Sequence, residues 1–151
     1  MEPSNLLPAF LLYCTSMLAT HEWYPVRVLL AKGEGRAACH FMDSDSTNHS
    51  QFVFPYISII TLASSPTTEL GTLPIWISAV LIVAACLLIF FAAEPRRKKA
   101  ILLNVGGSSD LPAALSGWIR VKRWSAGLIF GAFLASVWNL YVALTANVAS
   151  A

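Results

Sequence analysis

The chain has 151 residues, of which 56% are hydrophobic and 12% are charged, and its formal net charge is +2. Soluble globular domains carry about 25% charged residues, so this composition excludes an ordinary water-soluble domain. We predict a single membrane domain over residues 1–151, all-α and polytopic, because a backbone in lipid must satisfy its own hydrogen bonds.

The first apolar run covers residues 6–20 and is short for a bilayer crossing, which takes roughly 20 residues of helix. His21 and Glu22 end the run. Trp23 and Tyr24 follow, where an interfacial aromatic belt is expected. A cleaved signal peptide is the alternative, but this segment lacks a basic start and a small-x-small cleavage site. We therefore predict a retained first span.

Residues 21–71 are rich in Gly, Asp, Ser, Thr and Asn, which predicts an irregular extramembrane loop. Inside it, residues 52–63 form an apolar run that contains Pro55 and is shorter than a usual span. We predict about three transmembrane helices and keep four as the alternative. Asn48 opens an Asn-His-Ser sequon, a possible glycosylation site if the loop is lumenal.

Two stronger spans are predicted at residues 73–93 and 125–146, and neither contains a charged residue. This absence argues against a transporter or pump that works alone. The span at residues 125–146 has small or amide side chains at four-residue steps, which predicts a helix-packing face. The small side chains allow a neighbouring helix to approach closely, and the amide can form a hydrogen bond to that helix. This face consists of Gly127, Gly131, Ala135 and Asn139. It fits either an oligomer interface or contact with the protein's own spans.

The loop at residues 94–123 holds seven of the ten Lys and Arg residues. They are Arg96, Arg97, Lys98, Lys99, Arg120, Lys122 and Arg123. Basic residues near span ends stay in the cytoplasm, so this loop is predicted to be cytoplasmic and, with three spans, residues 21–71 non-cytoplasmic. Four spans would instead bring Lys32 and Arg36 to the cytoplasmic side. The cluster either fixes topology alone or also binds anionic lipid head groups.

No pattern in the chain predicts catalysis, a metal or another cofactor. The sequence from Cys39 to His49 contains Cys, His and Asp, but not at a spacing typical of zinc sites. His21-Glu22 does not begin H-E-x-x-H, since Pro25 occupies the second His position. The basic residues lie next to predicted spans, which argues against a nucleic-acid partner. We predict a non-enzymatic protein with no cofactor.

Several short motifs occur in the order found in a known family. They are LLPAFLLYCTSMLA at 6–19, the His21 to Pro25 stretch, FPYIS at 54–58, the span from Leu73, the basic residues 96–99, SAGLIFG at 125–131 and TAN at 145–147. In these the chain resembles the damage-regulated autophagy modulator (DRAM) proteins and their FRAG/Sfk relatives. It departs from them at residues 59–61, where the family has Asp-Thr-Gly. The match covers the first three spans only.

The resemblance implies a lysosomal, Golgi or plasma-membrane protein that modulates trafficking, autophagy or lipid organisation. It also implies a three-span topology with residues 21–71 lumenal. The alternative is a structural accessory subunit of a respiratory or photosynthetic type of complex, in an organellar inner membrane. Either function predicts membrane lipids as partners, together with other membrane subunits or a second copy of the chain.

Overall fold

The computed structural model describes residues 7–49 and 72–149, and all regular secondary structure within these ranges is helical. The predicted all-α class is thus confirmed. The helices are α1 (Leu7–Ala31), α2 (Gly35–His49), α4 (Thr72–Leu88), the π-helical turn η2 (Ile89–Ala93), α5 (Glu94–Val105) and α6 (Leu111–Ala149).

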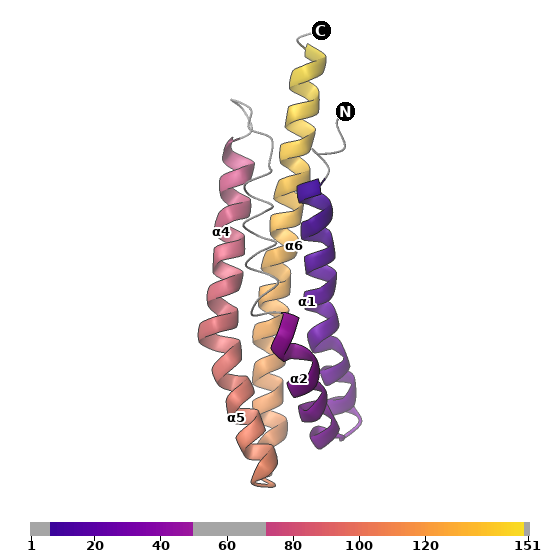
Figure 1. Cartoon of the computed structure of the whole chain (residues 1–151), viewed down its shortest axis with the longest axis vertical. Coiled ribbons are helices and arrows are strands. Elements are labelled where there is room, and N and C mark those ends of the chain that lie inside the picture. Colours follow the sequence, from indigo (N-terminus) through magenta and orange to yellow (C-terminus); the bar gives the residue numbers. More distant parts are fainter. Residues whose placement is uncertain (1–6, 50–71, 150–151) are drawn as a thin grey trace.

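Helix α6 is the axis of an elongated bundle and packs against both α1 and α4 (Figure 1). Helices α1 and α4 run in the same direction, antiparallel to α6. The turns that follow α1 and α5 lie at the same end of the bundle, and α2 folds back from that end along α1. Segments far apart in sequence therefore meet around the first half of α6.

Two helical stretches in the described ranges are long and apolar enough to cross a membrane, Trp76–Val105 and Leu111–Val142. The first joins α4, η2 and α5 into one continuous helix. The π turn directly precedes Pro95, and there the Glu94 N–H donates to the Ile89 carbonyl. A proline ring clashes with the carbonyl four residues earlier, which accounts for the wider turn at this point.

The irregular loop predicted from composition at residues 21–71 is corrected by the structure where it is described, because residues 21–31 continue α1 and residues 35–49 form α2. The predicted basic loop at residues 94–123 is mostly helical, with α5 and the start of α6. The reason is tertiary packing, because apolar side chains placed one helical turn apart in these polar segments meet in a shared core. The apolar run at 52–63 lies outside the described residues.

Both turns at the end of the bundle have the same glycine cap. Gly33 and Gly107 have positive φ angles of 79° and 63°, which side chains disfavour. After α1, the Glu34 N–H donates to the Leu29 carbonyl at 3.0 Å. After α5, the Ser108 N–H donates to the Leu103 carbonyl, also at 3.0 Å. These Schellman caps satisfy the last carbonyls of each helix and reverse the chain.

The bundle divides along its axis by charge. The charged half, residues 21–49 and 94–123, contains all ten Lys and Arg residues of the chain. The uncharged half, residues 7–20, 72–93 and 124–149, contains no Asp, Glu, Lys or Arg. The two halves meet at one level of the bundle, where α1, η2 and α6 each pass from apolar to charged sequence.

Candidate functional site

A buried ion pair lies where the two halves meet. Glu22 on α1 and Lys122 on α6 are in contact through Oε2 and Nζ, and their side chains are only 5% and 2% exposed. Burying either charge alone costs several kcal/mol, so a buried charge needs a partner. The pair therefore fixes the alignment of α1 against α6 at this level.

Aromatic rings surround the pair. The Lys122 ammonium lies 5.7 Å from the centroid of the Trp118 ring, which is itself buried. On the neighbouring turn, the Arg123 guanidinium lies 5.5 Å from the centroid of the Trp23 ring. Cations are attracted to the faces of such rings, so these contacts add to the electrostatic stabilisation of the site. The Ser125 hydroxyl donates to the Lys122 carbonyl at 2.9 Å.

The ion pair belongs to a long seam of buried residues on α6 that recur at alternating steps of four and three. They are Leu111, Leu115, Trp118, Lys122, Ser125, Ile129, Ala132, Ser136 and Asn139. This spacing is the heptad pattern of left-handed coiled coils. A polar residue at a core position of such a seam costs stability and specifies register. Lys122 and Asn139 occupy two of these positions.

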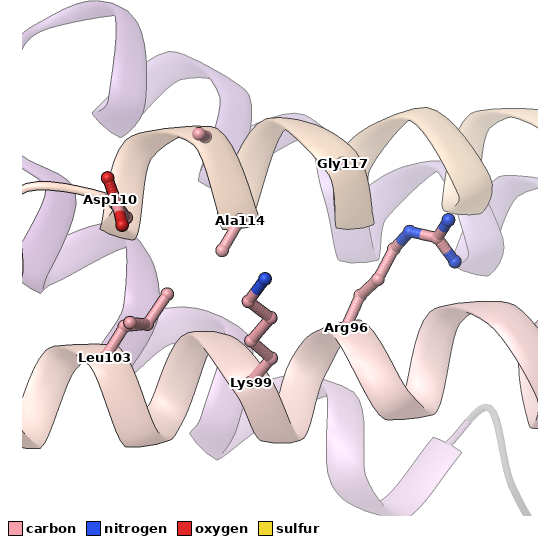
Figure 2. Close-up of a pocket in the computed structure, with 7 residues that line it drawn as sticks. Arg96, Lys99, Leu103, Asp110, Ala114 and Gly117 are labelled. Atoms are coloured by element: carbon pink, nitrogen blue, oxygen red, sulfur yellow. The ribbon is translucent and has the colours of Figure 1, made fainter.

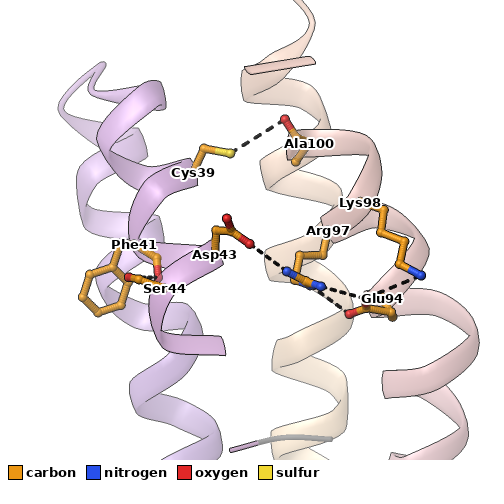
Figure 3. Close-up of polar contacts among 8 residues, drawn as sticks. All are labelled: Cys39, Phe41, Asp43, Ser44, Glu94, Arg97, Lys98 and Ala100. Carbon is orange, nitrogen blue, oxygen red and sulfur yellow. Dashed lines mark hydrogen bonds and ion pairs between the residues drawn. The ribbon is translucent and has the colours of Figure 1, made fainter. Parts of the chain in front are cut away.

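A second polar cluster joins α2 to α5 (Figure 3). The Arg97 guanidinium donates to both carboxylate oxygens of Glu94, at 2.9 and 2.8 Å, and to Asp43 at 2.8 Å. Lys98 lies 4.0 Å from the same Glu94 carboxylate. The cluster holds α2 against α5 at the surface of the charged half.

Beside this cluster, Cys39 of α2 is buried against α5. Its thiol lies 3.7 Å from the Ala100 carbonyl, as Figure 3 shows. Burial raises the pKa of the Cys39 thiol, and the negative charge of Asp43 raises it further. Because the thiolate is the reactive form, this environment disfavours reaction at Cys39.

An open groove of about 320 Å³ separates α5 from α6 at the other side of the charged half (Figure 2). Arg96 and Lys99 reach into it from α5, and Asp110 stands at the start of α6. Gly117 lies beneath Arg96, and a Cβ atom there would meet the Arg96 side chain at 3.7 Å. The groove carries both signs of charge at its surface.

The structure separates the predicted packing face into two parts. Gly131, Ala135 and Asn139 lie in the packed interior, and a Cβ atom at Gly131 would come within 3.2 Å of Leu81 of α4. Gly127 is exposed, and a Cβ atom there would meet nothing within 4 Å. Four residues exceed one helical turn of about 3.6 residues, so positions at four-residue steps rotate gradually around the helix. Gly127 therefore lies on a different side of α6 from the packed residues. The packed part contacts the protein's own α4.

The seven basic residues of the predicted cytoplasmic loop do not behave alike. Lys122 is buried against Glu22 and so does not offer its charge to lipid head groups, while its role in topology stays a prediction. Arg97 pairs with two carboxylates. The exposed remainder consists of Arg96, Lys98, Lys99, Arg120 and Arg123. The heptad spacing on α6 was the signal that could have identified Lys122 from sequence.

The remaining predicted positions lie in the charged half. Asn48 falls in α2, near the end of the described part of that helix. No three His, Cys, Asp or Glu side chains converge on a possible metal site in the described ranges 7–49 and 72–149.

Comparison with known proteins gave no match to a family model, a curated protein or a solved structure.

Proposed function

We propose that this is an integral membrane protein whose uncharged half lies in the bilayer and whose charged half forms a helical cap in the cytoplasm. The observation that carries the proposal is the confinement of all ten Lys and Arg residues to one half of the bundle. Basic residues are retained on the cytoplasmic side of membranes, and a bilayer core rejects charge.

The surface of the uncharged half supports this placement. Large apolar side chains point outward there, including Trp76, Phe91 and Tyr141, which are 69%, 78% and 64% exposed. Soluble monomers rarely expose an extended apolar surface, whereas lipid solvates it readily. Outward-facing aromatic and aliphatic side chains are therefore expected of a bilayer-embedded surface.

Exposed aromatic residues on α6 also match the dimensions of a bilayer. Trp124 begins the uncharged part of α6, and Tyr141 lies near its far end. At about 1.5 Å per residue they are roughly 25 Å apart along the helix, close to the roughly 30 Å thickness of a hydrocarbon core. Trp and Tyr concentrate at both membrane interfaces.

The contacts of α2 bear on the number of spans. Asp43 pairs with Arg97, and Cys39 lies against Ala100, so residues 35–49 contact residues 94–105 directly. The three-span arrangement would put a bilayer between these two segments. The four-span alternative puts both in the cytoplasm, along with Lys32 and Arg36. We therefore propose the four-span alternative, in which α1, α4–η2 and α6 are three of the crossings and the remaining one falls outside the described residues.

Within the membrane, we propose a non-enzymatic role in organising lipids or neighbouring proteins. The role of a DRAM-like modulator of trafficking, autophagy or lipid organisation belongs to this class. The resemblance also implies a three-span topology, which we do not propose. Of the roles that the resemblance implies, we retain lipid organisation.

One observation favours the second candidate, an accessory subunit of a larger complex. Leu102 and Val105, at the tip of the charged half, are 72% and 84% exposed although the proposed topology places them in water. A partner protein would cover them. A subunit is expected to co-migrate stoichiometrically with a large complex in mild detergent, and a lone modulator is expected to migrate by itself.

The topology is tested by cysteine accessibility in membrane vesicles. In a variant with Cys14, Cys39 and Cys86 replaced by Ser, single cysteines are introduced as Lys32→Cys and Ser109→Cys, both at exposed positions. The proposal expects a membrane-impermeant maleimide to label both from the cytoplasmic side. Labelling from opposite sides would reject four crossings. Release of the protein by alkaline carbonate would reject membrane integration itself.

A further inference from the structure

Two adjoining cavities form one groove along the outer surface of α6, and the first of them is also lined by α1. One has a volume of about 420 Å³ and the other about 450 Å³. They share Arg123 and Gly127 of α6 as lining residues. The groove therefore starts at the level of the buried ion pair and continues into the uncharged half.

Gly127 keeps the groove open. Open space surrounds its missing side chain to at least 4 Å. Met17 of α1 and Phe130 of α6 form apolar walls beside it, and both are about half exposed. The part of the groove in the uncharged half is thus mostly apolar, with small residues such as Ala126 and Gly127 at its floor.

The other end of the groove is cationic. Arg120 and Arg123 line it together with Trp124. The adjacent Lys122 is neutralised by Glu22, but neither arginine has an acidic partner among the residues that the structure describes. The Arg123 guanidinium is held over the Trp23 ring, which positions its charge at the mouth of the groove.

A cationic mouth that leads into a mostly apolar part of the groove is complementary to one class of ligand. We propose that the groove binds an anionic phospholipid, with its phosphate on Arg120 and Arg123 and one acyl chain over Gly127. Guanidinium groups bind phosphate oxygens in a bidentate manner, and indole rings such as that of Trp124 favour the interfacial level of lipids. This inference rests on the proposed membrane role, since it assigns a lipid to the bilayer-facing surface.

The test is native mass spectrometry of the full chain purified in mild detergent, with phosphatidylglycerol or phosphatidylcholine added in equal amounts. Gly127→Leu fills the apolar part of the groove, and Arg120→Gln with Arg123→Gln removes the cationic mouth. Val137→Phe controls for added bulk on α6 outside the groove. Arg96→Gln with Lys99→Gln controls for the loss of two positive charges elsewhere. Circular dichroism verifies that each variant keeps its helical content.

We expect the wild-type protein to retain one phosphatidylglycerol in preference to phosphatidylcholine. Each groove variant should lower retention about tenfold, because the arginine variant loses both guanidinium contacts to the phosphate and Gly127→Leu occupies the space of the acyl chain. Both controls should bind as the wild type does. Unchanged retention in both groove variants, or an equal loss in the controls, would overturn the lipid site.

Membrane extraction separates this failure from failure of the proposed function. All variants should stay in carbonate-washed membranes even where lipid retention is lost. A wild-type protein that carbonate releases would instead reject the membrane role on which the lipid site depends.

Discussion

The two halves of the bundle differ in what fills their centres. In the uncharged half Leu12, Ile82 and Ile129 are buried beside closer contacts, where Gly131 meets Leu81 and the Ser78 hydroxyl donates to the Ala132 carbonyl at 3.2 Å. In the charged half the centre holds Trp118 and Met42, which are 1% and 0% exposed, and the Glu22–Lys122 ion pair. Apolar burial drives packing in water, whereas close approach and hydrogen bonds drive it in lipid. The contacts of Gly131 and Ser78 are of the kind that the proposed placement of the uncharged half in a bilayer requires.

The largest loss of stability is expected for the ion pair at the border between the halves. Lys122→Met leaves the Glu22 carboxylate buried without its cation, and we expect a loss of about 3–5 kcal/mol in the free energy of unfolding. Replacing both partners, Glu22→Leu with Lys122→Met, should recover most of this loss, because an apolar pair needs no compensating charge. The measurement is unfolding by SDS in mixed micelles, followed by circular dichroism.

Arg27→Met is the matched control, since Arg27 is an exposed cation on α1. It should change stability by no more than about 0.5 kcal/mol. A Lys122→Met variant as stable as this control would show that the ion pair does not hold the border.

The next largest loss of stability tests the close approach of α4 and α6 in the uncharged half. Gly131→Val places a branched side chain where a Cβ atom already comes within 3.2 Å of Leu81, and overpacking of this kind costs about 1–3 kcal/mol. Gly127→Val is the control, four residues away on the same helix and in open space. The same SDS titration should show a loss at Gly131 and none at Gly127. Equal stabilities would contradict tight packing between α4 and α6.

How far the sequence alone predicts this molecule also differs between the halves. The all-α class, and apolar helices where the spans at 73–93 and 125–146 were placed, follow from hydropathy, since long runs without charge admit little else. The small-residue spacing predicted a packing face that includes Gly131, but it left open whether the partner is another span of this chain or a second copy.

The charged half could not be predicted in the same way. Its helices at 21–31 and 35–49 look like loops by composition, and they are stabilised by tertiary contacts, among them the shared core around Trp118. The pairing of Glu22 with Lys122 joins residues a hundred positions apart, and no local pattern in either segment specifies the other. By composition Lys122 is one more basic residue next to a predicted span, and only its position in the heptad seam of α6 indicates that it lies inside the bundle.

A smaller effect is expected at the two glycine caps of the charged half. Gly33→Ala and Gly107→Ala put a side chain on a residue with positive φ, which costs about 1 kcal/mol. Gly106→Ala is the control, because Gly106 has a φ of −76° that any residue adopts. Thermal unfolding in detergent should rank both cap variants below Gly106→Ala. A destabilised control with intact caps would contradict the left-handed turns.

The smallest change in stability is expected for Asp43→Asn, although the labelling rate of Cys39 reports this substitution sensitively. Asp43 is 52% exposed, and exposed ion pairs contribute about 0–1 kcal/mol. The same carboxylate helps to raise the pKa of the buried Cys39 thiol, so its removal lowers that pKa toward the ordinary value and increases the thiolate fraction at a given pH. Weaker attachment of α2 to Arg97 also exposes the thiol more often.

Both consequences of Asp43→Asn act in the same direction, so alkylation of Cys39 should become faster while the unfolding transition scarcely moves. The measurement is the rate of maleimide labelling from pH 7 to 9, with Cys14 and Cys86 replaced by Ser. Asp110→Asn removes a carboxylate that does not contribute to the raised pKa of Cys39 and should leave the rate unchanged. A rate that rises equally in both variants would mean that net charge, and not the clamp between α2 and α5, protects the thiol. A selective rise would show that the charged half is held by local ion pairs at its surface, in contrast to the close helix contacts of the uncharged half.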